Sequence, residues 1–320
     1  MKPGDSKCES YNFLQSQASS VDWFFLSLAG AASMAVTGVI DKFIIGKYVR
    51  NPLVYLIALV VLQQVFVVPI LVYAGWGFVY PQSIYALAAG FAQVILWGAY
   101  LRALQIEETS RVAALVYVFP VFVFLGAFVF LGEILTIKDY AGGTLLVLSA
   151  FLVSYKPAKR DGRRGLSPAL KYMAVFWVFT AAFALAAKYL LSFMNEWHLL
   201  LWTSLGGFLT VLPLLGWGEI RKEVSEYLRI SPYIFSVLIA DELFDFLGRS
   251  AFIFAYSLGS VALVSSVSAL QPFITLFYVV LLGLFVPGIL TEEMDRKTIG
   301  LKIAAILLIV AGVYLVSGAS

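Results

Sequence analysis

One apolar stretch of the sequence, SPYIFSVLIADELFDFLGRSAFIFAYSLG, contains four ionisable side chains. Asp241, Asp245 and Arg249 follow one another at intervals of four residues, so a helix would place them in one narrow stripe, and Glu242 would lie about 100° around the axis. If this helix crosses a bilayer, each charge at its centre costs about 2.5–3.5 kcal/mol, so these groups cannot face lipid. They could bind a polar ligand, carry a proton or pair with one another.

Two interpretations of this stripe stay open. In the first, it lines a wet cavity, where a carboxylate titrates and Arg249 holds the carboxylate of an amino-acid-like ligand. In the second, Asp245 and Arg249 form an internal ion pair that fixes helix packing, while Asp241 and Glu242 lie closer to a membrane interface.

A second polar face occurs in FAQVILWGAY, where Gln93, Trp97 and Tyr100 have the spacing i, i+4 and i+7. When the two halves of the chain are superposed on their prolines, Gln93 falls on Asp245 and Trp97 on Arg249. This face predicts a second wall of the same cavity. The alternative is ordinary packing, with Tyr100 anchored at a membrane interface.

The elements that must position these groups carry paired prolines. Pro120 and Pro272 lie near the middle of two apolar segments at corresponding places in the two halves. A proline inside a helix donates no hydrogen bond and frees the carbonyl four residues earlier, here that of Val116 or Ser268. Paired interruptions of this kind indicate a binding site in membrane proteins, so Ser268 and Gln271 are further candidate ligand groups.

The composition identifies a membrane protein. Of 320 residues, 61% are hydrophobic and only 13% are charged, with a mean hydropathy of +0.91. Soluble proteins usually carry about 25% charged residues. The net charge of +3 does not suggest nucleic acid, and the single Cys8 and single His198 exclude an internal disulfide and a Cys/His metal cluster, so we expect no cofactor and no metal.

Ten apolar runs are long enough, or nearly so, to cross a bilayer as helices. They are Trp23–Ile40, Leu53–Tyr73, Ile84–Leu104, Val112–Phe130, Tyr140–Tyr155, Tyr172–Leu191, Leu199–Leu215, Tyr233–Leu258, Val261–Val286 and Ile299–Ser317. The sequence therefore predicts an all-α membrane protein with ten transmembrane helices.

The basic stretch KPAKRDGRRGLSPALK divides the chain into two halves. We expect a polar segment at 1–21, a five-helix repeat at 22–155, a basic linker at 156–171 and a second five-helix repeat at 172–317. Because five is odd, the second half would enter the membrane from the opposite side. The two halves would then be inverted repeats around a central cavity.

The basic residues indicate an orientation. Of the 22 lysines and arginines, 17 lie in or beside the odd-numbered linkers, which would place those linkers in the cytoplasm and both termini outside. Lys42 and Lys188 are expected at helix ends, either reaching toward headgroups or acting in gating. Glu133 is expected to contact a neighbouring helix, and His198 to lie at an interface.

These residues resemble a known family. The sequence around Pro120, followed by Leu131-Gly132-Glu133 and a glycine-rich run from Gly142, resembles the end of an EamA domain of the drug/metabolite transporter superfamily. The second half resembles the same unit, although LLGLFVPG replaces Leu-Gly-Glu there. The resemblance implies a ten-helix basket around a cavity, with the fifth and tenth helices peripheral. It also implies ATP-independent transport of small metabolites, often amino acids. In addition it implies that both termini lie in the cytoplasm, whereas the distribution of basic residues places them outside.

We therefore expect a secondary active transporter, with export favoured, and not an enzyme, in a plasma or inner membrane. Its partners would be a small-molecule substrate, lipid and a coupling proton or ion, and it would be a monomer or homodimer. The alternatives are a non-transporting scaffold or receptor and, disfavoured by the scarcity of His and Cys, an integral-membrane enzyme. The candidate substrate-binding residues are Gln93, Trp97, Tyr100, Asp241, Asp245, Arg249, Ser268 and Gln271, with helix kinks at Pro120 and Pro272.

Overall fold

The computed structural model describes residues 5–48, 51–106, 112, 115–154, 169–229, 231–285 and 296–317. Within these residues the regular elements are all helical and no strand occurs, so the all-α class is confirmed for the described part of the chain. The elements are α1 (Asp5–Lys47), α2 (Pro52–Ala74), α3 (Gln82–Ile106), α5 (Phe119–Gly126), the π-helix η1 (Ala127–Leu131), α6 (Ile137–Ser154), α7 (Ala169–Leu190), α8 (Glu196–Leu215), α9 (Gly218–Leu228), α10 (Pro232–Leu258), α11 (Val261–Ser268), α12 (Gln271–Phe285) and α13 (Arg296–Ser317).

The predicted apolar runs coincide with α1, α2, α3, α5 with η1, α6, α7, α8, α10, α11 with α12, and α13. Five of these helices are long and apolar enough to cross a membrane, namely α2, α3, α7, α8 and the part of α1 from Asp22 to Asp41. The other predicted spans and the inverted repeat stay predictions. The polar segment predicted at 1–21 is helical from Asp5 and continuous with the first span, while the part of the basic linker from 156 to 168 lies outside the described residues.

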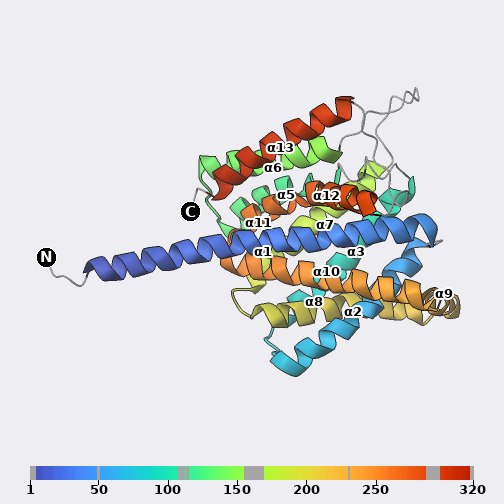
Figure 1. Ribbon diagram of the computed structural model, residues 1–320. Coiled ribbons are helices and arrows are strands. Elements are labelled where there is room, and N and C mark those ends of the chain that lie inside the picture. Colours follow the sequence, from blue (N-terminus) through green and yellow to red (C-terminus); the bar gives the residue numbers. More distant parts are fainter. Residues whose placement is uncertain are drawn as a thin grey trace.

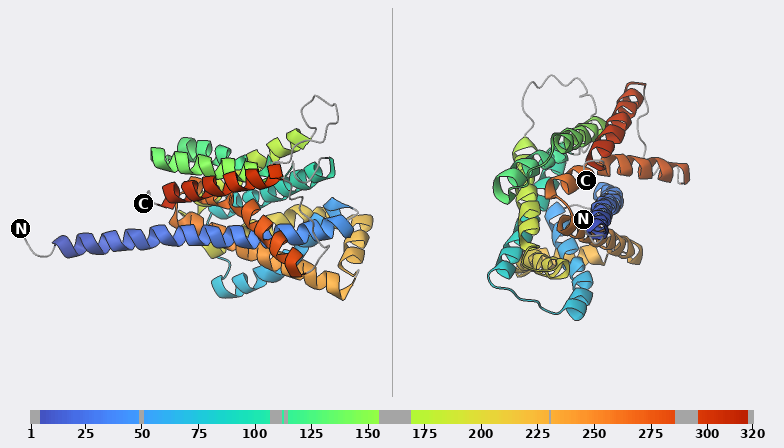
Figure 2. Two further views of the ribbon diagram at one scale, coloured as in Figure 1. Left: turned by 45° about the horizontal axis from the view of Figure 1, so that its top comes forward. Right: turned by 90° about the vertical axis from the view of Figure 1, so that its left-hand side faces the viewer.

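The helices run alongside one another in a bundle (Figure 1). The start of α1 and the end of α13 lie at the same end of the bundle, and α9 lies at the opposite end. The left view of Figure 2 shows that the first turns of α1 project beyond the bundle. α6 packs against α13 at one edge, consistent with the peripheral position implied for the fifth and tenth helices.

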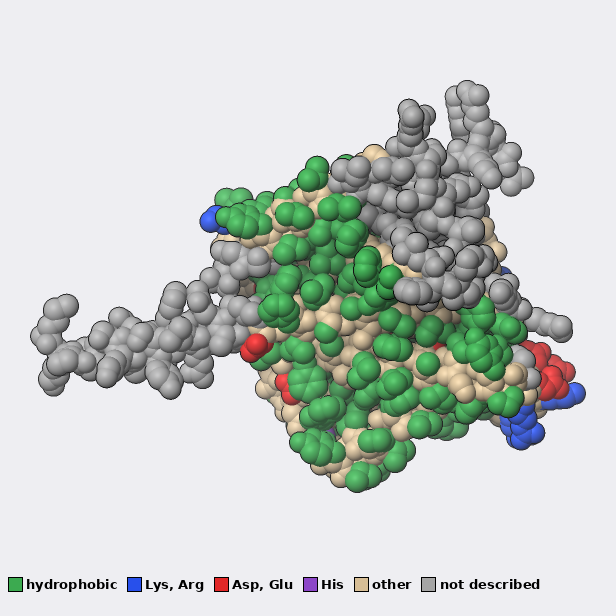
Figure 3. Space-filling view, in the orientation of Figure 1, with side chains coloured by type: hydrophobic (Ala, Val, Ile, Leu, Met, Phe, Trp, Pro, Cys, Tyr) green, Lys and Arg blue, Asp and Glu red, His purple; other side chains and the backbone are tan. Residues whose placement is uncertain are grey.

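The surface of this bundle is suited to lipid. On the face in Figure 3, hydrophobic side chains cover most of the described surface, while acidic and basic side chains gather at the end where α9 lies. On α2, for example, Val65, Val68 and Val72 are all exposed, the last by 82%. A soluble protein rarely leaves so much contiguous apolar surface uncovered.

One pair of helices, α3 and α8, approaches very closely at two glycines. A Cβ on Gly90 of α3 would overlap the carbonyl oxygen of Thr203, and a Cβ on Gly206 of α8 would overlap that of Leu87. Small residues allow this backbone contact, which is a common basis of helix association in membranes. These contacts fix the distance between α3 and α8, two helices that border the site described below.

The two prolines break their helices instead of kinking them. Pro120 is the second residue of α5, after a turn at 117–118, and Pro272 is the second residue of α12, after a turn at 269–270. The prediction that Pro120 and Pro272 each kink one continuous helix was therefore wrong. The first turn of a helix tolerates proline because its missing N–H would have no helical partner there. At the first break the carbonyl of Leu115 accepts a hydrogen bond from Trp177 Nε1 at 2.6 Å, so that polar group is satisfied.

The turn from α10 to α11 is held by two charged side chains, one from the segment after η1 and one from α7. The carboxylate of Glu133 accepts from the Ser260 hydroxyl at 2.6 Å and from the Val261 N–H at 3.2 Å, at the start of α11. Lys188 Nζ donates to the carbonyls of Tyr256 and Gly259, both at 2.7 Å, at the end of α10. Each charge thus complements a helix dipole. The expected helix contact of Glu133 is confirmed, while Lys188 caps a helix instead of reaching for headgroups.

Candidate functional site

A cavity of about 70 Å³ lies between α1, α2, α3, α8 and α10. Its lining combines acidic, amide, basic and aromatic side chains with aliphatic ones. The polar and aromatic lining residues are Thr37, Asp41, Tyr55, Gln63, Gln93, Trp97, Tyr100, Asp241, Glu242, Asp245 and Arg249. Side chains that are far apart in the sequence therefore meet at one buried polar site.

Six of the eight predicted ligand residues line this cavity. They are Gln93, Trp97, Tyr100, Asp241, Asp245 and Arg249. The other two lie elsewhere and bind backbone carbonyls: the Ser268 hydroxyl donates to the nearby Ser265 carbonyl at 2.6 Å, and Gln271 Nε2 donates to the Met34 carbonyl of α1 at 3.1 Å. Ser268 and Gln271 thus belong to the helix break before Pro272 and not to the cavity lining.

The sequence analysis missed the contributions of α1 and α2. Asp41 stands beside Lys42 at the end of the first apolar run and was placed in a basic linker, whereas its side chain lines the cavity. Tyr55 and Gln63 belong to the second run. The adjacent glutamines Gln63 and Gln64 in the middle of that run are the signal that could have revealed a polar face. The side chain of Lys42 lies outside the described residues.

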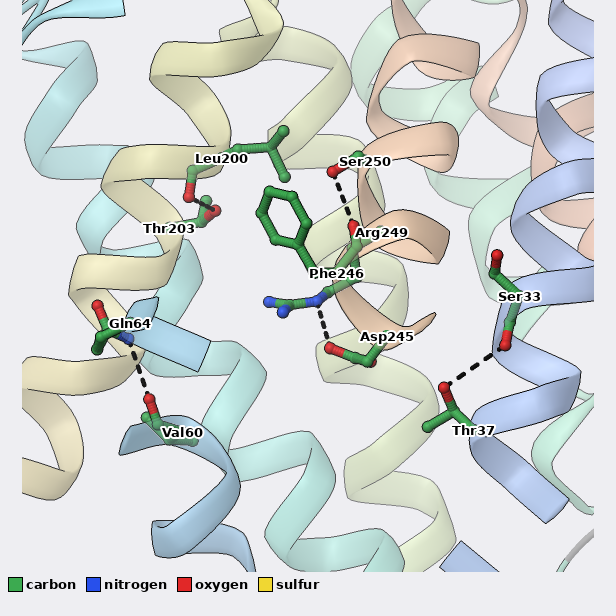
Figure 4. Close-up of polar contacts among 10 residues, drawn as sticks. All are labelled: Ser33, Thr37, Val60, Gln64, Leu200, Thr203, Asp245, Phe246, Arg249 and Ser250. Atoms are coloured by element: carbon green, nitrogen blue, oxygen red, sulfur yellow. Dashed lines mark hydrogen bonds and ion pairs between the residues drawn. The ribbon is translucent and has the colours of Figure 1, made fainter. Parts of the chain in front are cut away.

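Arg249 already has partners in the structure. Its Nε lies 2.7 Å from Asp245 Oδ2, and the two side chains are only 10% and 17% exposed. Figure 4 shows the guanidinium projecting from α10 away from Ser33 and Thr37 of α1. The amide of Gln63, with its oxygen turned toward the guanidinium, accepts from both terminal nitrogens. The structure therefore contains both features that the sequence left as alternatives. Asp245 and Arg249 form an internal ion pair, and this pair lies at the wall of a cavity.

A tyrosine hydroxyl stands between two carboxyl groups. Tyr55 donates a hydrogen bond to Asp41 Oδ1, and its oxygen lies 3.4 Å from Asp241 Oδ2. Because a phenol has one proton, it can donate fully to only one of the two carboxyl groups. The carboxyls of α1 and α10 thus compete for one donor from α2.

Two further carboxyl oxygens have no partner within the described structure. Asp241 is 1% exposed and its Oδ1 accepts no hydrogen bond, and Glu242 is 4% exposed with Oε2 likewise unsatisfied. A buried, ionised and unpaired carboxylate is strongly unfavourable, so such oxygens require a proton or a cation.

The charges at the cavity do not balance. Asp41, Asp241, Glu242 and Asp245 line it, and among the described lining side chains Arg249 is the only cation. Arg249 is already paired with Asp245, so the other three acidic side chains of the lining have no cationic partner there. In the described part of the chain no group of three His, Cys, Asp or Glu is arranged as metal ligands would be. The site can accept protons or an organic cation.

One wall of the cavity is aromatic. The rings of Trp97 and Tyr100 have centroids 5.7 Å apart in an edge-to-face arrangement, and Phe176 of α7 contacts both from behind. Such packing holds the two cavity-lining rings in place. The face predicted from Gln93, Trp97 and Tyr100 is therefore both a cavity wall and a packing surface.

Comparison with solved structures addresses the fold. One crystal structure, described only as "Crystal structure of protein", aligns with 93% of this chain and 96% of its own at a TM-score of 0.59 and 17% identity. At that identity the likeness concerns the fold alone. No curated protein sequence matches the chain.

The family assignment comes from the first half. Residues 22–155, the bounds expected for the first repeat, match the EamA-like transporter family. The helices of this half carry Asp41, Tyr55 and the aromatic wall, and the apolar helices are those of a multi-pass membrane protein. Residues 22–155 are thus an EamA-type domain of the drug/metabolite transporter superfamily.

Proposed function

We propose that this protein is a secondary active transporter that moves small polar metabolites by alternating access, with amino acids as the favoured substrates and export as the favoured direction. The family supports transport in general. The observation that carries the proposal further is the buried polar cavity, which α1, α2 and α3 of the first half share with α8 and α10 of the second.

The mechanism that we propose is a rocking of the two halves about this cavity. Side chains of the two halves meet there, as Tyr55 and Asp241 do, so relative movement of the halves would change the cavity lining. The contact of Glu133 with the start of α11 joins the halves elsewhere and would break or shift as one side opens.

The energy source would be an ion gradient or the gradient of the substrate itself. The sequence contains no GxxxxGK[ST] phosphate-binding loop. A proton is the favoured coupling ion because buried carboxyl groups with an unpartnered oxygen, such as those of Asp241 and Glu242, can exchange protons as the cavity opens.

Uptake into proteoliposomes tests the proposal. Radiolabelled amino acids would be offered with and without a pH gradient to the wild-type protein and to Asp241→Asn and Asp245→Asn. We expect gradient-dependent uptake that both substitutions reduce, while the exposed control Glu226→Gln on α9 keeps it. Unchanged gradient dependence in both variants would remove the coupling role, and the lack of any uptake of any offered metabolite would overturn the transporter proposal.

A further inference from the structure

We infer that the cavity recognises the ammonium group of its substrate through Asp41, Asp241 and Glu242. This inference rests on the proposed function and defines its substrate class as small organic amines, amino acids included. The ammonium is the essential feature in this scheme, and a substrate carboxylate is not required. An ammonium group has three donors, which suits a site made of carboxylate acceptors.

The unsatisfied oxygens are the first reason. Asp241 Oδ1 and Glu242 Oε2 are acceptors on side chains that are 1% and 4% exposed, and no group in the described structure donates to them. Both residues line the cavity, so a donor that enters the cavity can reach them. A cationic donor offsets the desolvation of these groups far better than a neutral one.

The arrangement of Arg249 is the second reason. A substrate carboxylate would need the guanidinium, but Asp245 and Gln63 already engage its Nε and both terminal nitrogens. Binding a carboxylate there would displace Asp245 and leave one more acidic group unpaired. The described cavity therefore offers free acceptors and a donor that is already in use.

The aromatic wall is the third reason. Trp97 and Tyr100 line the same cavity, and Phe176 holds their rings in position. Aromatic faces attract organic ammonium groups, with tryptophan the strongest. A bare metal ion gains less from such a wall, and the described acidic groups do not converge as metal ligands.

The size of the cavity agrees with this assignment. Its volume of about 70 Å³ can hold an ammonium head with a short carbon chain, since a cavity needs about 10–15 Å³ to hold one water molecule. The hydrophobic side chains of Leu56, Leu59 and Val94 line the remainder of the wall and would contact that chain.

Three probes of similar size separate the possible recognition modes. L-2-aminobutyrate carries both charged groups, n-propylammonium lacks the carboxylate, and butyrate lacks the ammonium. Binding to the protein in lipid nanodiscs would be followed by calorimetry and by thermal stabilisation. We expect n-propylammonium and L-2-aminobutyrate to bind and butyrate not to bind. Binding of butyrate with no binding of n-propylammonium would overturn the inference.

Carboxyl variants test the residues. Asp241→Asn and Glu242→Gln should each weaken n-propylammonium binding about tenfold or more, because each removes one charge-assisted partner. Glu226→Gln, a matched change on the exposed α9, should leave the affinity unchanged. Unaltered affinity in folded Asp241→Asn and Glu242→Gln would overturn the inference.

A double variant tests whether binding depends on the ion pair between Asp245 and Arg249. The double change Asp245→Asn with Arg249→Gln removes the ion pair as a unit, which avoids leaving either charge alone. It should weaken n-propylammonium binding less than Asp241→Asn or Glu242→Gln does, since neither Asp245 nor Arg249 is assigned to the ammonium in this scheme. A loss of n-propylammonium binding in this folded variant that is larger than in Asp241→Asn and Glu242→Gln would assign recognition to the ion pair, contrary to the inference.

Two controls identify other outcomes. Sodium chloride at the same concentration should give no comparable stabilisation, and equal stabilisation by sodium would make this an inorganic cation site and overturn the inference. If proteoliposomes take up L-2-aminobutyrate and both carboxyl variants transport it normally, transport stands and ammonium recognition fails. If n-propylammonium binds through the carboxyls but no amine or amino acid crosses the membrane, the inference stands and the proposed function fails.

Discussion

The ion pair between Asp245 and Arg249 allows a quantitative test of the site's internal design. Arg249→Gln would leave Asp245 without its counter-ion in a cavity that already holds three other acidic groups. Breaking a buried ion pair costs about 3–5 kcal/mol. Because the Asp245 side chain is 17% exposed to solvent, we expect a cost in the lower part of that range, about 3 kcal/mol.

The opposite substitution should cost less. Asp245→Asn removes the carboxylate but leaves the Gln63 amide as an acceptor for the guanidinium. We expect about 1.5 kcal/mol, the lower range for a hydrogen bond to a charged group. In the double variant the charges disappear together, so it should be at least about 1.5 kcal/mol more stable than Arg249→Gln alone.

Reversible unfolding in mixed detergent micelles would measure these free energies for the four proteins of the cycle. The expected interaction energy between the two sites is about 3 kcal/mol or more, well above the range in which independent changes add. If the two single effects add within about 0.5 kcal/mol, the ion pair contributes no coupling, and the account of a neutralised Arg249 is refuted.

Three further predictions concern positions outside the cavity. Glu133→Gln should lower stability by about 1–2 kcal/mol in thermal unfolding, because the start of α11 loses its negative cap, and an unchanged midpoint would contradict this role. Gly206→Ala should cost about 1–3 kcal/mol or prevent folding, because a Cβ would overlap the Leu87 carbonyl, whereas Gly218→Ala, with open space around it, should fold normally. Tyr227→Phe should leave stability unchanged or raise it by up to about 1 kcal/mol, because the buried hydroxyl has no partner in the described structure. Burial raises the pKa of Tyr227, so the wild type should lose stability above about pH 10, where the unfolded tyrosine ionises; equal losses in Tyr227→Phe would contradict this.

The sequence predicted helices well because the relevant signal is local. Long apolar runs define α2, α3, α7 and α8, and the spacing of the acidic stripe correctly placed three charged side chains on one face of α10. Paired prolines correctly located two interruptions. Their form was less predictable, since whether Pro120 kinks a helix or begins a new one depends on partners such as Trp177, which is 62 positions from the carbonyl that it binds.

The rest of the site depends on tertiary contacts. Asp41 beside Lys42 is indistinguishable in sequence from a charge at a membrane interface, and only the packing of α1 against α10 brings it near Asp241. Lys188 similarly shows no sign in the sequence that it caps a helix 68 positions away. Ser268 and Gln271 are polar residues beside a proline, but their partners are nearby backbone carbonyls, which composition cannot reveal.

The placement of the chain ends has a practical consequence for topology experiments. Because the start of α1 and the end of α13 lie at one end of the bundle and α9 at the other, fluorescent or protease-sensitive tags fused to either end would report the same compartment. A cysteine introduced at the exposed Lys222 of α9, in a protein whose single native cysteine is removed by Cys8→Ser, would report the opposite compartment. Impermeant maleimide labelling of intact cells would then settle sidedness with two engineered proteins.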